Sequence, residues 1–196
     1  MNAIVAENGA VALWRGPDAE LCKTHLQDAA TRQANFAQLQ AVAQRIQRKL
    51  PHTRLSQDSP GRETDIAIDH SEFSHLPPSA IDAVVRILRS EGMSATVSSI
   101  HINGWFGEHN KLSGARWIVR ELWGRDLEAE IDRWVYVGDS TNDQVMFERF
   151  PHSVGVANIR RFEAQLTHPP RYITPSERGA GFAELAQHLL NGIAST

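Results

Sequence analysis

Two carboxylates and a carboxamide stand close together after a short apolar run in the second half of the chain. The run, Val135–Val137, is followed by Gly138 and by a turn that carries Asp139, Asn142 and Asp143. If the run is a buried parallel strand, the turn lies beyond its carboxyl end, where open α/β sheets bind their ligands. Clustered oxygen ligands at such a place suit Mg²⁺, and the start of a following helix favours an anion. The alternative is an acidic turn that only caps a helix, because motifs this short also occur without a function.

A lysine at the start of the preceding expected helix adds to this chemistry. Lys111 stands in the segment Glu108–Gly114, where helical periodicity begins. A lysine there can reach a phosphate as a compact point charge. Taken alone, an exposed helical lysine is nearly always a solvated surface residue, so its meaning depends on the turn at Asp139.

The first half of the chain must fold into the elements that position these residues. Apolar residues at helical spacing predict two helices, the first ended by Pro51 and the second begun by Ser79 as N-cap. Ile66 and Ile68 alternate with polar or small residues, which predicts a half-buried strand. The expected elements, in order, are strands at 3–6 and 11–14, a helix at 24–50, a strand at 64–69, a helix at 79–92 and a strand at 95–102. Residues 24–102 are therefore expected to form a compact α+β unit.

The second half changes character after Gly104, because strands and helices now alternate. This alternation predicts a doubly wound α/β layer, in which the apolar run near residue 135 is a fully buried parallel strand. The expected elements are a helix at 110–123, a strand at 134–137, a helix at 144–150, strands at 153–157 and 171–174, and a helix at 182–190.

Composition limits the classes of partner. The 196 residues are 41% hydrophobic with a net charge of -3, which is typical of a globular protein and does not favour nucleic acid. Cys22 is the only cysteine, and no apolar run approaches the length of a membrane span. The first residues also lack the pattern of a signal peptide. We therefore expect a cytoplasmic protein with neither nucleic acid nor membrane as a partner.

Together these segments resemble the haloacid dehalogenase (HAD) superfamily, and in particular its Cof-like, sugar-phosphatase-like type IIB phosphatases. The two most specific parts of the resemblance are Ala6–Ala10, Ala-Glu-Asn-Gly-Ala, and Gly138–Asp143, which is similar to motif IV of the family. Other parts that match in order are Lys111 as the motif III lysine, the segment Ser153–Asn158, and the C-terminal segments Tyr172–Thr174 and Gly179–Phe182.

The resemblance implies a fold and a reaction. The fold would be α/β, a doubly wound Rossmannoid core with an inserted α+β type IIB cap. The reaction would be Mg²⁺-dependent hydrolysis of a small phosphorylated metabolite, most often a sugar phosphate, through an aspartyl-phosphate. By resemblance, Asp139 ligates Mg²⁺, Asp143 is a second metal partner, and Lys111 and Asn142 hold the phosphate.

The resemblance has one large departure. Motif I of the family, Asp-x-Asp, and motif II, a phosphate-binding Ser or Thr, precede the segment that resembles Ala6–Ala10, and no Asp-x-Asp occurs in the 196 residues. The core is therefore expected to be N-terminally incomplete, and the chain as given to lack activity. Two alternatives remain open: a sugar-phosphate mutase of the same superfamily, and a non-catalytic fragment or binding module.

The resemblance also divides the chain. Residues 1–23 and 103–196 would form the core, and residues 24–102 the cap, with Gly104 and Gly107 as hinge positions. Candidate substrate contacts on the cap are polar residues near its ends, although for each an ordinary surface or hinge role is the more common one: Arg62, His101 and Asn103.

Overall fold

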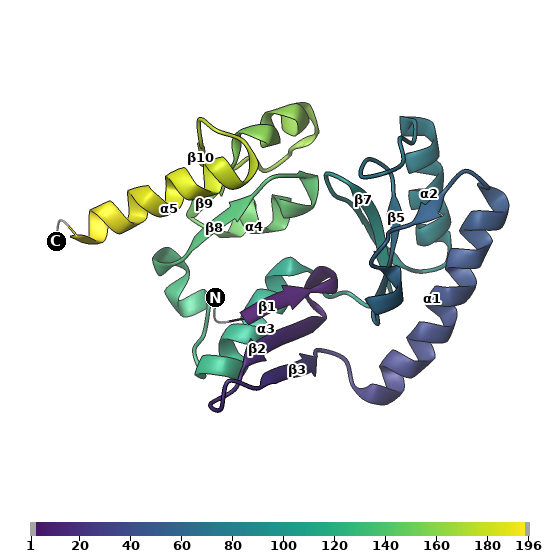
Figure 1. Ribbon diagram of the computed structural model, residues 1–196, viewed down its shortest axis with the longest axis horizontal. Helices are drawn as coiled ribbons and strands as arrows, with labels where there is room; N and C mark the ends of the chain where they lie inside the picture. The colour runs from purple at the N-terminus through teal and green to yellow at the C-terminus, as the bar shows by residue number, and fades with distance from the viewer. Residues whose placement is uncertain (1–2, 195–196) are drawn as a thin grey trace. The chain divides into compact units, whose positions relative to one another are not determined.

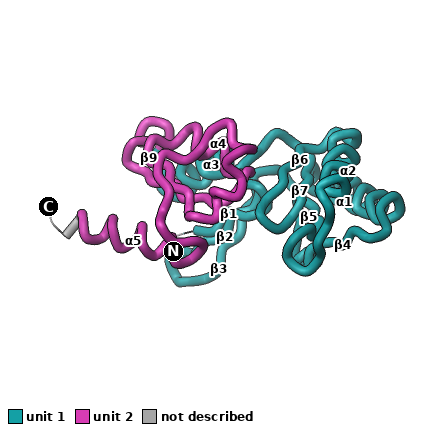
Figure 2. Tube along the Cα trace, turned by 90° about the horizontal axis from the view of Figure 1, so that it is seen from above, with its two compact units in different colours: residues 1–125 teal, residues 126–196 magenta. Residues whose placement is uncertain are grey.

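The chain is a mixed α/β protein, as predicted, in a computed structural model that describes residues 3–194 (Figure 1). It divides after Arg125 into two compact units (Figure 2). The first unit contains two antiparallel sheets, and the second contains one parallel sheet. Among the helices in residues 3–194, none combines the length and the apolar character that crossing a bilayer requires.

The smaller sheet of the first unit is an antiparallel meander in the order β1-β2-β3. Its strands are β1 (Ala3–Ala6), β2 (Val11–Arg15) and β3 (Leu21–His25), and the short 3-10 turn η1 (Glu7–Gly9) joins the first two. The first two strands were predicted. The third was not, because Leu21 is exposed and its neighbours give no clear alternation of apolar and polar residues.

The larger sheet of the first unit has four antiparallel strands in the order β4-β5-β7-β6. They are β4 (Arg54–Leu55), β5 (Asp65–Asp69), β6 (Ser94–Val97) and β7 (His101–Trp105). The helices α1 (Ala29–Lys49) and α2 (Pro78–Ser90) contribute to one core with these strands, and η2 (Ser59–Gly61) precedes β5. The core between helices and strands contains Leu39, Val42, Ile46, Ile66, Ile68, Val84, Leu88 and Ile102. Because alternate strand residues face opposite sides, the other face of this sheet carries the polar positions of β5 and β7.

Several local expectations for this region are wrong. Residues 95–102 form a hairpin instead of one strand, because Ser98 accepts a hydrogen bond from the amide of His101 and turns the chain. Helix α1 begins at Ala29, after strand β3, with Asp28 as its N-cap. Pro77, rather than Ser79, is the N-cap of α2. All five residues of β5 are buried, so the strand is not half-exposed.

The expected hinge at Gly104 is also wrong. Gly104 lies inside β7, paired with Ile66 and Ala95, and a Cβ atom there would come within 2.6 Å of the Leu88 side chain. Its small size therefore lets α2 approach the sheet. Gly107, beyond the end of β7, has a φ of +113° and lies outside any helix or strand.

Helix α3 (Lys111–Trp123) belongs to the first unit and contacts η1 and β1. The second unit alternates strands and helices around a parallel sheet of order β10-β9-β8, as predicted. Its elements are η3 (Glu128–Arg133), β8 (Val135–Gly138), η4 (Thr141–Asp143), α4 (Gln144–Arg149), β9 (His152–Gly155), η5 (Ala157–Gln165), β10 (Tyr172–Ile173) and α5 (Arg178–Ala194). The expectation of a fully buried strand β8 is wrong. In this sheet it is an edge strand, and Val135 is 37% exposed.

Candidate active site

The turn after β8 is built around the buried carboxylate of Asp143. This side chain is 1% exposed, and its Oδ2 atom accepts hydrogen bonds from the amides of Asp139 at 2.8 Å and Ser140 at 3.1 Å. Its Oδ1 atom accepts a short hydrogen bond from the hydroxyl of Tyr136. Both oxygens of Asp143 therefore hold the turn in shape, and the amide of Asp139 is fixed by one of these bonds.

Two features of strand β8 make room for this carboxylate and keep it bonded. A Cβ atom on Gly138 would lie 2.7 Å from the carboxyl carbon of Asp143, so glycine allows the close approach. Burial, together with the negative charge and hydrogen bond of Asp143, raises the pKa of Tyr136, which therefore stays protonated as a donor. Sequence reasoning missed Tyr136; the signal was a hydroxyl on a strand residue that precedes the acidic turn.

Asp139 is the carboxylate that the turn presents. It is partly exposed, and the buried side chain of Asn158 donates hydrogen bonds to its Oδ2 atom at 3.2 Å and to its backbone oxygen at 3.4 Å. The Oδ1 atom of Asn158 in turn accepts a hydrogen bond from the amide of Arg178, whose φ is +53°. Asn158 follows β9, so the ends of two neighbouring parallel strands position Asp139.

Asn142 lies in the same turn, where its Oδ1 atom accepts a hydrogen bond from the Ser140 hydroxyl at 2.7 Å. The structure thus brings Asp139, Asn142 and Asp143 together within one short loop. Within residues 3–194, no three side chains of His, Cys, Asp or Glu converge as a metal site.

The turn nevertheless fits Mg²⁺ as a partial site. Mg²⁺ is usually bound through one or two carboxylates, with waters and phosphate oxygens completing its coordination. Asp139 can supply one such carboxylate from a fixed position. The hydrogen bonds to Asp143 give that residue a positioning task, so Asp139 is the carboxylate of this turn that could ligate a metal ion directly.

Lys111 is the first residue of α3 and is partly exposed. The preceding residue, Asn110, caps the helix by accepting hydrogen bonds from the amides of Leu112 at 2.9 Å and Ser113 at 3.1 Å. The helix start therefore gives Lys111 a defined backbone position within the first unit. The turn at Asp139 belongs to the second unit.

The three candidate substrate contacts lie on or beside the face of the four-stranded sheet that is opposite its core with α1 and α2. His101 is buried and its Nε2 atom lies 2.8 Å from Glu72 Oε2. Asn103 is two residues further along β7 and therefore lies on the same face of the sheet as His101. It is also buried. Arg62 bonds to Asp65, which also belongs to this face, so all three candidates are associated with one surface.

Arg62 bridges two carboxylates in this region. Its Nη1 atom lies 2.7 Å from Asp65 Oδ1, while its Nε and Nη2 atoms bond to the two oxygens of Asp58 at 3.0 Å and 2.8 Å. Burial lowers the pKa of Arg62, but the two carboxylates outweigh it and raise the pKa overall. The side chain of Asp65 is fully buried, and burial raises the pKa of Asp65 to about 6 although Arg62 and Asn8 oppose the shift.

We expect Asp65→Asn to change how stability depends on pH. Because the pKa of Asp65 is higher in the folded than in the unfolded protein, its contribution to the free energy of unfolding falls as pH rises from about 4 to about 6. A shift of this size corresponds to about 3 kcal/mol between the protonated and charged forms. Denaturant unfolding at pH 4 to 7 should therefore show the variant gaining stability relative to the natural protein across this window. Parallel stability curves would contradict the prediction.

A separate apolar groove of about 650 Å³ lies in the second unit, between its sheet and α5. Its lining includes Val135, Val154, Tyr172, Leu185 and Leu189. Asp139 and Asn142 do not line it, so the groove and the acidic turn are different features of this unit.

Comparison with known proteins places this geometry in a fold. No protein-family model matches the chain, and no curated protein matches it in sequence. Among solved structures, a haloacid dehalogenase-like hydrolase from B. subtilis aligns with a TM-score of 0.58 at 14% identity, over 95% of this chain and 79% of that one. The chain has a HAD-like α/β fold. This confirms the predicted fold class.

Two further structures align over most of their length. The sucrose-phosphatase from Synechocystis sp. PCC6803, solved with sucrose and phosphate, has a TM-score of 0.57 at 17% identity, over 85% of this chain and 69% of that one. A protein from Streptococcus mutans UA159 reaches 0.63 at 15% identity, over 96% and 77%. At these identities the likeness concerns the HAD-like fold alone.

Proposed function

We propose that this chain is part of a Mg²⁺-dependent phosphatase of the HAD type. Its substrate would be a small phosphorylated metabolite, and the class we propose is a sugar phosphate. The observation that carries the proposal is the fixed carboxylate of Asp139 beyond the end of a parallel strand, held by Asn158. That position is where α/β sheets bind ligands. The likeness in fold to a hydrolase and to a sucrose-phosphatase supports the same reading.

The residues of the turn would divide the work. Asp139 would ligate Mg²⁺, and Asp143 would keep the turn in shape and act as a more distant metal partner. Lys111 and Asn142 would hold the phosphate through a positive charge and an amide. When bound, the metal supplies positive charge that stabilises the phosphoryl oxygens as the bond to the leaving group breaks.

The nucleophile of such a reaction would come from outside these 196 residues. In the family, an aspartate oxygen forms a bond to phosphorus while the bond to the leaving alcohol breaks, and water then hydrolyses the aspartyl-phosphate. No Asp-x-Asp occurs in the sequence that would provide the nucleophile and its neighbouring acid/base. We therefore propose that the chain as given does not turn over substrate.

The domain organisation is part of the proposal. Residues 24–102 would form a type IIB cap, and residues 1–23 and 103–196 would belong to the core. The four-stranded sheet supports this division, because its strands share one hydrophobic core with α1 and α2. Arg62, His101 and Asn103 would lie on the substrate side of the cap, and the protein would act in the cytoplasm.

Phosphate release is the test of this function. Purified residues 1–196, and the same chain extended by the reading frame upstream of Met1, should be incubated with a panel of sugar phosphates, with Mg²⁺ or with EDTA. We expect release from the extended chain with Mg²⁺, none with EDTA, and none from the short chain. Equal release from both chains would refute the external nucleophile. Release by neither chain, or a requirement for a bisphosphate activator, would refute the phosphatase and, in the latter case, favour the mutase.

A further inference from the structure

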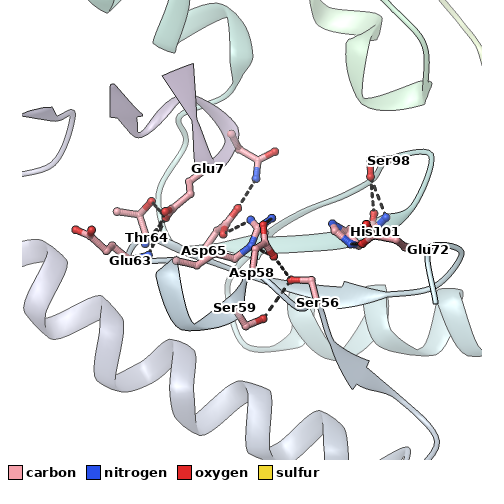
Figure 3. A network of polar contacts seen from close by, with 12 residues as sticks. Glu7, Ser56, Asp58, Ser59, Glu63, Thr64, Asp65, Glu72, Ser98 and His101 are labelled. Carbon is pink, nitrogen blue, oxygen red and sulfur yellow. Dashed lines mark hydrogen bonds and ion pairs between the residues drawn. The ribbon is translucent and has the colours of Figure 1, made fainter. Parts of the chain in front are cut away.

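The turn η1 is bonded to the start of strand β5 by a carboxylate that accepts four hydrogen bonds. The Oε2 atom of Glu7 accepts from the amide and hydroxyl of Thr64 at 2.5 Å and 2.6 Å. The amide of Glu63 donates to both oxygens of Glu7, at 3.0 Å and 3.2 Å (Figure 3). A single side chain thus binds the two backbone amides that immediately precede strand β5.

The next residue of the turn adds a second tie. The Nδ2 atom of Asn8 donates to Asp65 Oδ2 at 2.8 Å. Asp65 is fully buried and its other oxygen is held by Arg62, so this acceptor has little freedom to follow a moving partner. The first residue of β5 and the two residues before it, 63–65, are therefore tied to two consecutive residues of η1.

The backbone of η1 is held in the left-handed region over three residues. The φ values are +50° for Glu7, +57° for Asn8 and +103° for Gly9. This conformation is unfavourable for a residue such as glutamate, and it persists only where surrounding contacts hold it. The five hydrogen bonds to residues 63–65 are contacts of that kind. The conformation of the turn therefore depends on these hydrogen bonds.

The other side of η1 rests directly on the start of α3. A Cβ atom on Gly9 would lie 2.3 Å from the backbone oxygen of Asn110, and one on Gly114 would lie 2.5 Å from the Cα atom of Gly9. Two glycines thus allow backbone-to-backbone contact. Asn110 is the N-cap of α3 and the residue immediately before Lys111.

We propose that η1 couples the position of the four-stranded sheet to the start of α3, with Glu7 and Asn8 as positioning residues. Movement of β5 away from η1 breaks the five hydrogen bonds, releases the left-handed backbone of residues 7–9, and loosens the contact with Asn110. The position of Lys111 then becomes less defined. The coupling concerns the fold of the first unit, and its meaning for phosphate binding rests on the function proposed above for Lys111.

Residue-resolved amide hydrogen exchange tests the coupling without requiring turnover. Two variants cut the ties: Asn8→Gly, which tolerates the left-handed φ, and Thr64→Val, which removes one hydroxyl donor and keeps the size. Each variant removes one tie and leaves the amide hydrogen bonds of Glu63 and Thr64 to Glu7 in place, so exchange at these two amides should rise through the loosened turn. We expect a rise on the order of tenfold, as the loss of one hydrogen bond implies. The informative amides are those of Leu112 and Ser113, which bond to Asn110, and we expect their exchange to rise as well.

A matched variant and an internal reference keep the result specific. Thr31→Val removes a hydroxyl that bonds to Asp28 in the same unit, and it should leave Leu112 and Ser113 unchanged. The amides of Ile68 and Ile102 in the sheet centre report on global unfolding. Faster exchange at Thr64 with no change at Leu112 and Ser113 would refute the coupling. If Asn8→Gly also exposes Ile68, the milder Thr64→Val decides by the same criterion.

A turnover measurement separates this proposal from the function itself. In the catalytically competent protein, Asn8→Gly should lower kcat, and it should have no further effect when Lys111 is already alanine. Additive losses in the double variant would refute a route through Lys111. If no phosphatase activity exists, the exchange result still stands or falls by itself.

Discussion

Replacing Asp139 with alanine in the catalytically competent protein should lower Mg²⁺-dependent hydrolysis of phosphate esters by roughly 10³-fold or more. The carboxylate of Asp139 is the one that the turn after β8 presents, while the oxygens of Asp143 accept hydrogen bonds from the turn itself. Alanine removes this charge and leaves the ties of Asp143 intact, so the turn should persist. Steady-state phosphate release and calorimetric titration with Mg²⁺ measure the two consequences.

Asp139→Asn and Glu163→Gln serve as controls. Asparagine keeps the size of the side chain and can keep the contact with Asn158, but it removes the negative charge. The affinity for Mg²⁺ should therefore fall. Glu163 is exposed and pairs with Arg160 on the surface, so Glu163→Gln should leave both readouts unchanged. If activity and Mg²⁺ affinity survive Asp139→Ala, the resemblance of this turn to motif IV does not extend to its function.

Lys111→Ala should reduce turnover by about 10²-fold, because a positive charge close to the phosphoryl oxygens is lost in the transition state. Lys111→Arg should rescue poorly, since a planar guanidinium does not replace a compact ammonium group. Lys111 is the first residue of α3, and the N-cap of this helix is the side chain of Asn110. Neither variant should therefore unfold the helix. Circular dichroism checks the fold, and kcat and KM are measured separately.

Lys49→Ala provides a matched loss of one lysine at an exposed position in the last turn of α1. It should leave kcat unchanged. Near-normal kinetics in both Lys111 variants would contradict the phosphate-binding role and indicate that Lys111 is an ordinary surface lysine.

The sequence predicted most elements because their signals are local. The helix at α3 and the strand at β8 have clear periodicity or a clear apolar run, and both lie within a residue or two of their expected bounds. Strand β3 was missed because residues 21–25 carry no local strand pattern. They form a strand because they pair with β2 in the folded chain. The hairpin at 94–105 was missed because the turn is made by Ser98, whose hydroxyl bonds back to the chain, without glycine or proline.

The acidic turn was predictable as a group, but its internal division was not. Three residues in five positions identified the loop, whereas the assignment of Asp143 to backbone support depends on Tyr136 and on the two amides that it binds. The polar contacts of Arg62 illustrate the same limit. Asp58 and Asp65 are near in sequence, but only the folded chain buries Asp65 and makes Arg62 a bridge.

The contact between Gly9 and the start of α3 has a consequence for biosynthesis. Strand β1 and the turn that follows it are made roughly a hundred residues before their partner helix, an interval of several seconds at typical rates of translation. The helices and strands between Ala29 and Trp105 are contiguous and can fold while they emerge. The nascent chain must therefore carry the turn η1 without its packing partner until α3 has been made. Slowed translation before Asn110 should for this reason lengthen the period in which the newborn protein depends on chaperones.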